Sequence, residues 1–258
     1  MLKLYEHPLS PYAQKVKLSL YEKGIEFEAA MPNLFGNDQE FARVSPRREV
    51  PALVDGNTAI FDSTIILEYI EDKWPKPPML PESPAERARV RMLEDLCDTY
   101  YEAINWGLAE VNFFKRATGD LANRITEAAA KQIAGVHQWL ERELGNREWF
   151  NGASFGWGDL SVLPYVNGSV GFGFAPSAGS RLAKWHAAAN SRPSAKKCAE
   201  AVAPVMAGFQ QASTLIESGA MVREYRDHRL EWMMRSGGKQ VVLDGMEKKN
   251  IRFHVDIT

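Results

Sequence analysis

Prolines crowd one short stretch of the chain and divide it into two parts of different character. Proline lacks a backbone hydrogen-bond donor and has a fixed φ, so a run of prolines forms neither a helix interior nor a central strand. Residues 73–84 are therefore predicted to be a linker between domains. The prolines concerned are Pro75, Pro77, Pro78, Pro81 and Pro84. The chain has 258 residues, enough for a small domain before the linker and a larger one after it.

Before the linker, apolar residues alternate between the two-residue period of a strand and the longer period of a helix. The predicted order is strand, helix, strand, helix, strand, strand, helix. The predicted elements cover residues 2–6, 12–23, 25–30, 39–44, 50–54, 58–61 and 63–73. Between the last two strands, Asp55-Gly56-Asn57 suits a tight hairpin turn. The pattern predicts an α+β domain over residues 1–76.

After the linker, helical spacing dominates. The predicted helices cover residues 85–116, 121–144, 159–166 and 181–189, with a glycine-rich loop over 168–179. We predict an all-α domain over residues 85–206.

The last part of the chain, residues 207–258, is predicted to be a C-terminal extension. Ser236-Gly237-Gly238 interrupts it, and residues 240–243 form a strand-like run. Residues 222–234 mix charged and apolar residues at helical spacing. That segment suits either a lid over a pocket or a surface that packs on a partner subunit.

Composition excludes several classes of function. The formal net charge of -2 gives no basic field for binding nucleic acid. No run approaches the roughly 20 apolar residues that cross a bilayer, and the first residues lack the pattern of a leader, so we expect a cytoplasmic protein with no membrane partner. The two cysteines, Cys97 and Cys198, form no CxxC pair, and the five histidines have no metal-site spacing. We expect no metal.

The order of elements, a proline at the head of the third strand and a helical domain after a proline-rich linker together resemble the cytosolic glutathione transferases. The resemblance covers residues 1 to about 205. It implies a thioredoxin-like N-terminal domain (βαβαββα) that binds glutathione, followed by an all-α helical-bundle domain that holds a small hydrophobic electrophile. It also implies a homodimer.

Ser10 stands between the first strand and the first helix, in the sequence Ser10-Pro11-Tyr12-Ala13. Serine before proline is a common helix start, so Ser10 suits an N-cap. In the family resembled, this position holds the residue that hydrogen-bonds the glutathione sulfur, and a serine there is similar to the plant tau class. Ser10 would then stabilise the thiolate without being the nucleophile. Classes with cysteine at this position form mixed disulfides, which Ser10 disfavours.

The segment Arg48-Glu49-Val50-Pro51 leads into the third strand, which is predicted to begin at Val50. It resembles the family segment in which a cis proline exposes the backbone of the preceding residue to glutathione, as an added strand would. Glu49 departs from the glutamine or lysine common in the family. Arg48 suits a glutathione carboxylate, although a solvated basic loop formed by Arg47 and Arg48 is an equal alternative.

Asp62-Ser63 opens the last helix of the first domain, where the family has Glu-Ser or Gln-Ser. The resemblance implies that Asp62 pairs with the γ-glutamyl ammonium and Ser63 with its carboxylate. A plain N-cap is the alternative, and both roles are compatible.

In the second domain, the segment around Gly156 resembles the family's helix-capping box. Asp159 is expected to bond the backbone there, as a structural feature. The walls of the electrophile pocket are expected on the first long helix of this domain together with Tyr12. The candidates are Tyr12, Tyr100, Tyr101, Asn105, Trp106 and Leu108.

These residues predict a glutathione transferase that activates the glutathione thiol for attack on an apolar electrophile. Two alternatives remain open. One is a glutathione-dependent ether or thioether lyase, suggested by the extension. The other is a non-catalytic interaction protein on the same fold.

Overall fold

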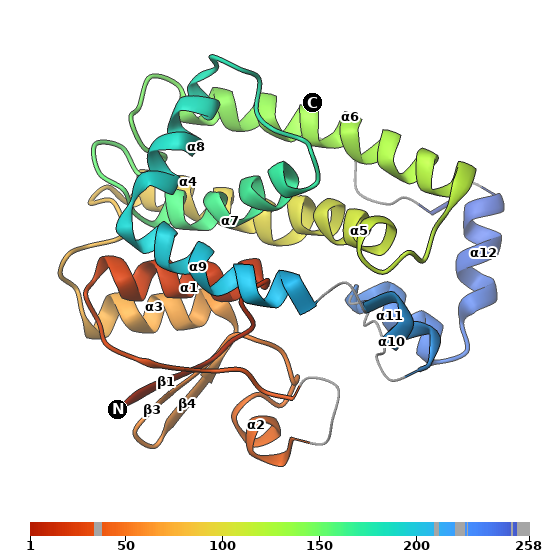
Figure 1. Ribbon diagram of the computed structural model, residues 1–258, viewed down its shortest axis with the longest axis horizontal. Helices are drawn as coiled ribbons and strands as arrows, with labels where there is room; N and C mark the ends of the chain where they lie inside the picture. Colours follow the sequence, from red (N-terminus) through yellow and green to blue (C-terminus); the bar gives the residue numbers. More distant parts are fainter. Residues whose placement is uncertain (34–37, 209–211, 220–224, 226, 249, 252–258) are drawn as a thin grey trace.

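The computed structural model describes residues 1–33, 38–208, 212–219, 225, 227–248 and 250–251. The first domain is built on one four-stranded sheet with strand order β2-β1-β3-β4 (Figure 1). The strands are β1 (Leu2–Tyr5), β2 (Glu28–Ala30), β3 (Ala52–Asp55) and β4 (Thr58–Phe61). β1 is parallel to β2 and antiparallel to β3, and β3 is antiparallel to β4. The α+β class and the predicted element order are confirmed.

Three helices cover the sheet: α1 (Pro11–Glu22), α2 (Gln39–Val44) and α3 (Ser63–Lys73). Successive residues of a strand point to opposite faces. Leu4 and Leu53 accordingly join the main core, to which α1 and α3 also contribute, while Tyr5 and Ala52 pack with Phe41 of α2. The two central strands are therefore buried on both faces.

The second domain is helical, as predicted, but its first long helix contains a π-helical turn. Its helices are α4 (Pro84–Leu96), the π-helical turn η1 (Cys97–Tyr101), α5 (Glu102–Asn112), α6 (Gly119–Leu144), α7 (Trp157–Gly171), α8 (Arg181–Ser191) and α9 (Pro193–Gly208). α7 extends beyond the predicted 159–166 and contains Pro164. Burial of most of α7 outweighs the loss of one hydrogen bond at that proline.

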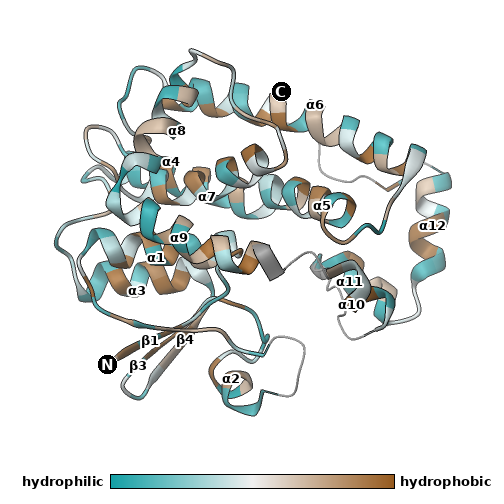
Figure 2. Ribbon diagram, viewed as in Figure 1, coloured by the Kyte–Doolittle hydropathy of each residue, from teal (hydrophilic) through white to brown (hydrophobic). Residues whose placement is uncertain are grey.

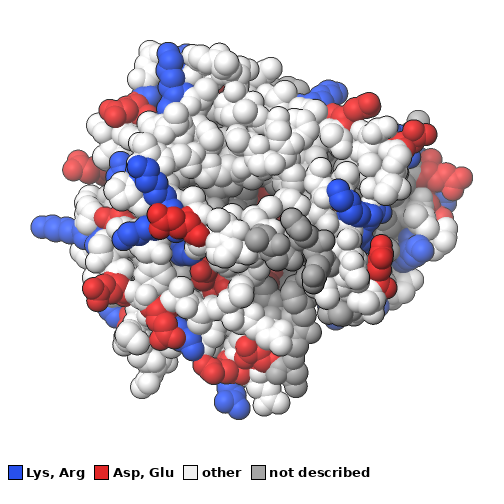
Figure 3. Space-filling view, in the orientation of Figure 1, with Lys and Arg blue, Asp and Glu red and all other residues white. Residues whose placement is uncertain are grey.

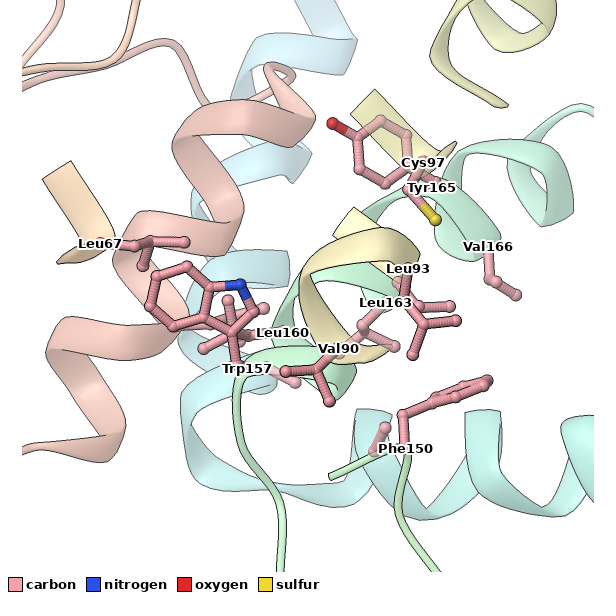
Figure 4. Close-up of a cluster of buried hydrophobic side chains, with 14 of the residues drawn as sticks. Leu67, Val90, Leu93, Cys97, Phe150, Trp157, Leu160, Leu163, Tyr165 and Val166 are labelled. Atoms are coloured by element: carbon pink, nitrogen blue, oxygen red, sulfur yellow. The ribbon is translucent and has the colours of Figure 1, made fainter. Parts of the chain in front are cut away.

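A continuous apolar core joins the two domains. Leu67 of α3, Val90 and Leu93 of α4, and Trp157 and Leu160 of α7 belong to it (Figure 4). α1 also packs along α7, and α9 lies against α1 (Figure 1). The two domains therefore share one interior, which fixes how the first residues of α1 and α3 face the helical domain.

The extension holds α10 (Ala212–Glu217), α11 (His228–Arg235) and α12 (Lys239–Glu247). The predicted strand over residues 240–243 is wrong, because these residues lie in α12. A run of three apolar residues, such as Val241, Val242 and Leu243, does not distinguish a strand from a helix by itself. Figure 2 shows apolar residues on α12 at the edge of the molecule, and Val241 and Met246 are exposed there. Part of the segment 222–234 lies outside the described residues.

Charges on the surface are mixed. Lysine and arginine are interspersed with aspartate and glutamate over the face seen in Figure 3. Within the described residues, no helix is long and apolar enough to cross a membrane.

Candidate functional site

Ser10 is the N-cap of α1. Its backbone is extended, and its Oγ accepts a hydrogen bond from the Ala13 amide at 3.2 Å. A hydroxyl has one hydrogen to donate and two lone pairs. The cap uses one lone pair, and none of the described residues accepts a hydrogen bond from Ser10. The side chain can therefore cap α1 and donate its hydrogen to a ligand.

Tyr12, in the first turn of α1, reaches the second domain. Its hydroxyl donates to the backbone carbonyl of Asp98 at 2.7 Å, and its ring meets the Tyr165 ring edge-on at 6.2 Å. Burial raises the pKa of Tyr12, so this hydroxyl stays protonated. The charges of Glu102, Asp98, Glu49 and Asp62 raise that pKa further. The beginning of α1 is therefore a meeting point for acidic groups from both domains.

The loop before β3 places a free backbone beside this point. The Val50–Pro51 peptide bond is cis, as predicted. Ser45 binds both backbone groups of Glu49, the residue before Val50. Its Oγ accepts a hydrogen bond from the Glu49 amide at 3.2 Å and donates one to the Glu49 carbonyl at 3.0 Å. Among the described residues, none bonds the Val50 amide or carbonyl. Val50 is left with an unpaired donor and acceptor, as strand-like pairing with an extended peptide requires.

Asp62 caps α3 and also forms an ion pair. Its Oδ1 accepts from the amides of Thr64 at 3.0 Å and Ile65 at 3.3 Å. Its Oδ2 lies 3.1 Å from Nη2 of Arg47. Asp62 has a φ of 78°, which is uncommon for a residue other than glycine. Ser63, the first residue of α3, is buried, and its hydroxyl forms no hydrogen bond with other described residues.

The arginine that joins the site is Arg47 rather than its neighbour. Arg47 Nε lies 2.9 Å from Glu49 Oε2, so the guanidinium bridges Glu49 and Asp62. Arg48 is exposed in the left-handed backbone region, with a φ of 54°, and forms no ion pair with described residues. The sequence pattern favoured Arg48 for the glutathione carboxylate, with a solvated loop formed by Arg47 and Arg48 as the alternative. The turn that follows α2 sends the Arg47 side chain to the site and the Arg48 side chain to solvent.

A buried ion cluster joins α1 to α4 and η1, and no sequence motif indicated it. Lys15 Nζ is 2.5 Å from Glu94 Oε1 and 2.5 Å from Asp98 Oδ2. Tyr165 donates to the other Asp98 oxygen at 2.6 Å. Burial raises the pKa of Asp98, and the charge of Lys15 opposes this shift. Because the cluster joins α1 to the helical domain, it fixes the helix that begins at Ser10.

The pocket candidates of the second domain fall in different surroundings. Tyr101 is fully buried, with its hydroxyl 2.7 Å from both His137 Nε2 and Ser169 Oγ. Asn105 is partly buried and donates to the Tyr165 carbonyl at 2.9 Å. Trp106 is partly exposed, and Tyr225 of the extension meets it edge-on at 4.3 Å. The structure brings Tyr12 to the site and places Tyr101 in the core, so we leave Tyr101 out of the proposed pocket.

Asp159 performs the structural role expected of it. Its carboxylate accepts from the Gly156 amide at 3.1 Å, the Phe150 amide at 2.8 Å and Trp185 Nε1 at 2.7 Å. Gly156 has no room for a side chain, since an added Cβ would lie 2.4 Å from the Met79 carbonyl. Glycine therefore stands here because the linker passes directly over the start of α7.

Comparison with known proteins agrees with this architecture. Residues 4–78 match the family model of the glutathione S-transferase N-terminal domain. Glutathione S-transferase U28 of Arabidopsis thaliana is 30% identical over 160 residues, which are 61% of this chain and 68% of the relative.

Solved structures give the same result. A glutathione S-transferase from Rhodospirillum rubrum superposes with a TM-score of 0.69 at 28% identity, over 77% of this chain and 91% of the other. Rice GST1, solved in complex with glutathione, has a TM-score of 0.65 at 27% identity, over 76% of this chain and 89% of the other.

A thioredoxin-like domain followed by a helical domain is the architecture of the glutathione S-transferases. This chain belongs to the glutathione S-transferase family and is an enzyme of that family.

Proposed function

We propose that the protein transfers glutathione to an electrophilic, largely apolar substrate and that Ser10 holds the glutathione sulfur as a thiolate. The supporting observation is the state of the Ser10 hydroxyl, which caps α1 through a lone pair and keeps its hydrogen free. A free thiol has a pKa of about 8.5 and is mostly neutral at pH 7. A donated hydrogen bond and the positive end of α1 both favour the anion.

The reaction then needs no acid or base from the protein. The thiol proton leaves to water as glutathione binds, and a sulfur lone pair attacks the electrophilic carbon. The leaving group departs with the bonding electrons. Most of the rate comes from the lowered thiol pKa and from holding the two reactants together.

The peptide part of glutathione carries one ammonium and two carboxylates. In the proposed complex the Val50 backbone pairs with the cysteinyl unit. Asp62 takes the ammonium through Oδ2, and Ser63 with the free amides of the α3 start takes the neighbouring carboxylate. Arg47 turns from its two carboxylates toward the remaining glutathione carboxylate, a role first considered for Arg48. Glu49 then serves to hold Arg47 in place.

The electrophile is proposed to sit between Tyr12 and α5, with Asn105 and Trp106 nearby.

We also propose that the enzyme is a cytoplasmic homodimer. Three exposed apolar side chains, Phe61, Ile65 and Met92, come from β4, α3 and α4. A depression of about 440 Å³ is lined by Arg47, Phe61 and Ile65. Light scattering should give twice the mass of one chain, and Ile65→Asp should shift the measured mass toward that of a single chain.

The test of the site is an ultraviolet difference spectrum of glutathione titrated with the protein and with Ser10→Ala. A thiolate band at neutral pH that the variant loses is the expected result. Glutathione binding without a Ser10-dependent band would remove the assigned role of Ser10. Absence of glutathione binding would favour the non-catalytic interaction protein.

A further inference from the structure

A second cavity opens on the helical domain, away from the first residues of α1 and α3. It has a volume of about 630 Å³ and is lined by α6, by residues 173–180 and by Leu182 of α8. None of the residues assigned to glutathione lines it. A volume of this size is typical of sites for small organic ligands.

His137 of α6 lines this cavity and is connected to the core by a chain of hydrogen bonds. Its Nε2 lies 2.7 Å from the Tyr101 hydroxyl, which lies 2.7 Å from Ser169 Oγ, which donates to the Val166 carbonyl at 3.0 Å. A carbonyl can only accept, so the Ser169 hydrogen is committed to Val166. Ser169 must then accept from Tyr101, and Tyr101 must accept from His137.

This direction fixes the hydrogen on His137. All three bonds form together only when Nε2 carries the hydrogen, which leaves Nδ1 as an acceptor. Burial, with a smaller contribution from the nearby His186, lowers the pKa of His137 to about 4, so the ring is neutral at pH 7. None of the described residues donates a hydrogen bond to Nδ1.

The rest of the lining limits what the cavity accepts. Ile133, Phe174 and Leu182 give it apolar walls. The Glu141 carboxylate is already committed, because its oxygens accept from the amides of Arg181 at 2.9 Å and Leu182 at 2.7 Å. Gln138 and Arg142 also line the cavity. One position that no described residue fills is the acceptor Nδ1 of the neutral His137 imidazole, which calls for a ligand with a hydrogen-bond donor.

We propose that this cavity is a second ligand site that binds a small, largely apolar molecule with one hydroxyl or N–H donor, of the phenol or naphthol type, and that His137 Nδ1 accepts its hydrogen bond. The ligand does not need to react, and the thiol site stays free. Binding here is independent of the glutathione assignment.

The probe is 1-naphthol, and 1-methoxynaphthalene is the matched molecule without a donor. Calorimetric titrations are made on the full chain with saturating S-hexylglutathione, which occupies the proposed thiol and electrophile sites. Ala134→Trp fills the cavity from an exposed position on α6, and Ala128→Trp places the same side chain on α6 outside the cavity. Circular dichroism confirms that both variants fold.

We expect 1-naphthol to bind about fivefold more tightly than 1-methoxynaphthalene, the effect of one neutral hydrogen bond. Ala134→Trp should weaken 1-naphthol at least tenfold, and Ala128→Trp should not. Tyr101→Phe removes the acceptor for Nε2–H, lets the imidazole carry its hydrogen on either nitrogen, and should reduce the fivefold preference toward one.

Equal binding of 1-naphthol to Ala134→Trp and the unchanged protein would overturn the site, as would no binding beside S-hexylglutathione. Equal affinity for the two naphthalenes would overturn the role of His137. If S-hexylglutathione itself does not bind, the proposed function fails separately, and the pair of tryptophan variants still decides the cavity.

Discussion

The Lys15 ammonium lies 2.5 Å from the Glu94 carboxylate although 79 residues separate them, and both side chains are buried. The same carboxylate accepts from Thr64 Oγ1 at 2.8 Å and from Trp157 Nε1 at 2.6 Å. Thr64 is in the first turn of α3, and Lys15 is in the second turn of α1. Glu94 therefore holds α1 and α3 against the helical domain. The first residues of these two helices form the proposed glutathione site.

Replacement of Lys15 by methionine should destabilise the protein strongly. It leaves the Glu94 and Asp98 carboxylates buried without their cation, and breaking a buried pair in this way costs about 3–5 kcal/mol. Urea unfolding measures the loss. Lys15→Met combined with Glu94→Gln should recover part of it, while Lys131→Met on the exposed side of α6 should change little. A loss below about 1 kcal/mol for Lys15→Met would contradict the assigned role.

Arg47 and Arg48 give a matched test of the peptide site. Arg47→Ala should raise the KM for glutathione by roughly tenfold with little change in kcat, because a charge-assisted contact made equally in the ground and transition states is lost. Arg48→Ala should leave both constants within about twofold. Steady-state kinetics with glutathione varied makes the comparison. The reverse result would return the carboxylate to Arg48.

The contrast between these arginines shows what sequence can and cannot provide. Ser10 and Asp62 were predicted as helix caps because capping depends on residues within one turn, and both cap as predicted. The choice of Arg47 depends on the direction of a turn, with Asp62 far along the chain. Two adjacent arginines are chemically identical in the sequence, so only the folded backbone shows which side chain reaches Asp62.

Longer-range features were not accessible from the sequence. Lys15 occurs in a helical pattern where lysine usually indicates a solvated position. Only the packing of α1 against α7, together with the ion pair to Glu94 of α4, buries it. Tyr101 stands one residue from Tyr100 in an aromatic run, yet the π-helical turn directs it into the core. Residues 240–243 show the opposite limit, since a short apolar run fits two structures until its neighbours are placed.

His137 predicts how stability depends on pH. Its pKa is lowered to about 4 in the fold against 6.5 for an ordinary histidine, so the unfolded chain binds a proton between these values while the folded chain does not. Stability contributed by the neutral ring is present above pH 6.5 and is lost as pH falls toward 4, by about 1 kcal/mol per pH unit at most. Urea midpoints measured across this window for the unchanged protein and His137→Gln should show a shallower slope in the variant. Equal slopes for the two proteins would contradict this effect of His137 on stability.

Tyr225 tests what the extension does. Its ring covers Trp106, and its hydroxyl lies 3.3 Å from Glu110 Oε2. If Trp106 borders the electrophile, Tyr225→Ala should change the KM for an aromatic electrophile by about three- to tenfold and leave the KM for glutathione unchanged. Trp232→Ala, at an exposed position of α11, is the control. A loss of dimer in light scattering with unchanged kinetics would instead place the extension at the subunit contact.

The π-helical turn at Cys97–Tyr101 has a consequence for how such an enzyme can change. One residue of an α-helix corresponds to a rotation of about 100°. The extra residue of the π-helical turn does not add this rotation, because the turn closes with a bond from the Glu102 amide to the Cys97 carbonyl, five residues back, while α4 and α5 keep their orientation around it. Removing a single residue from this turn would therefore restore a regular helix and leave Ile104 and Leu108 in the core. A one-codon deletion could thus change the side chains of the turn itself, Tyr100 and Tyr101 among them, without moving α5.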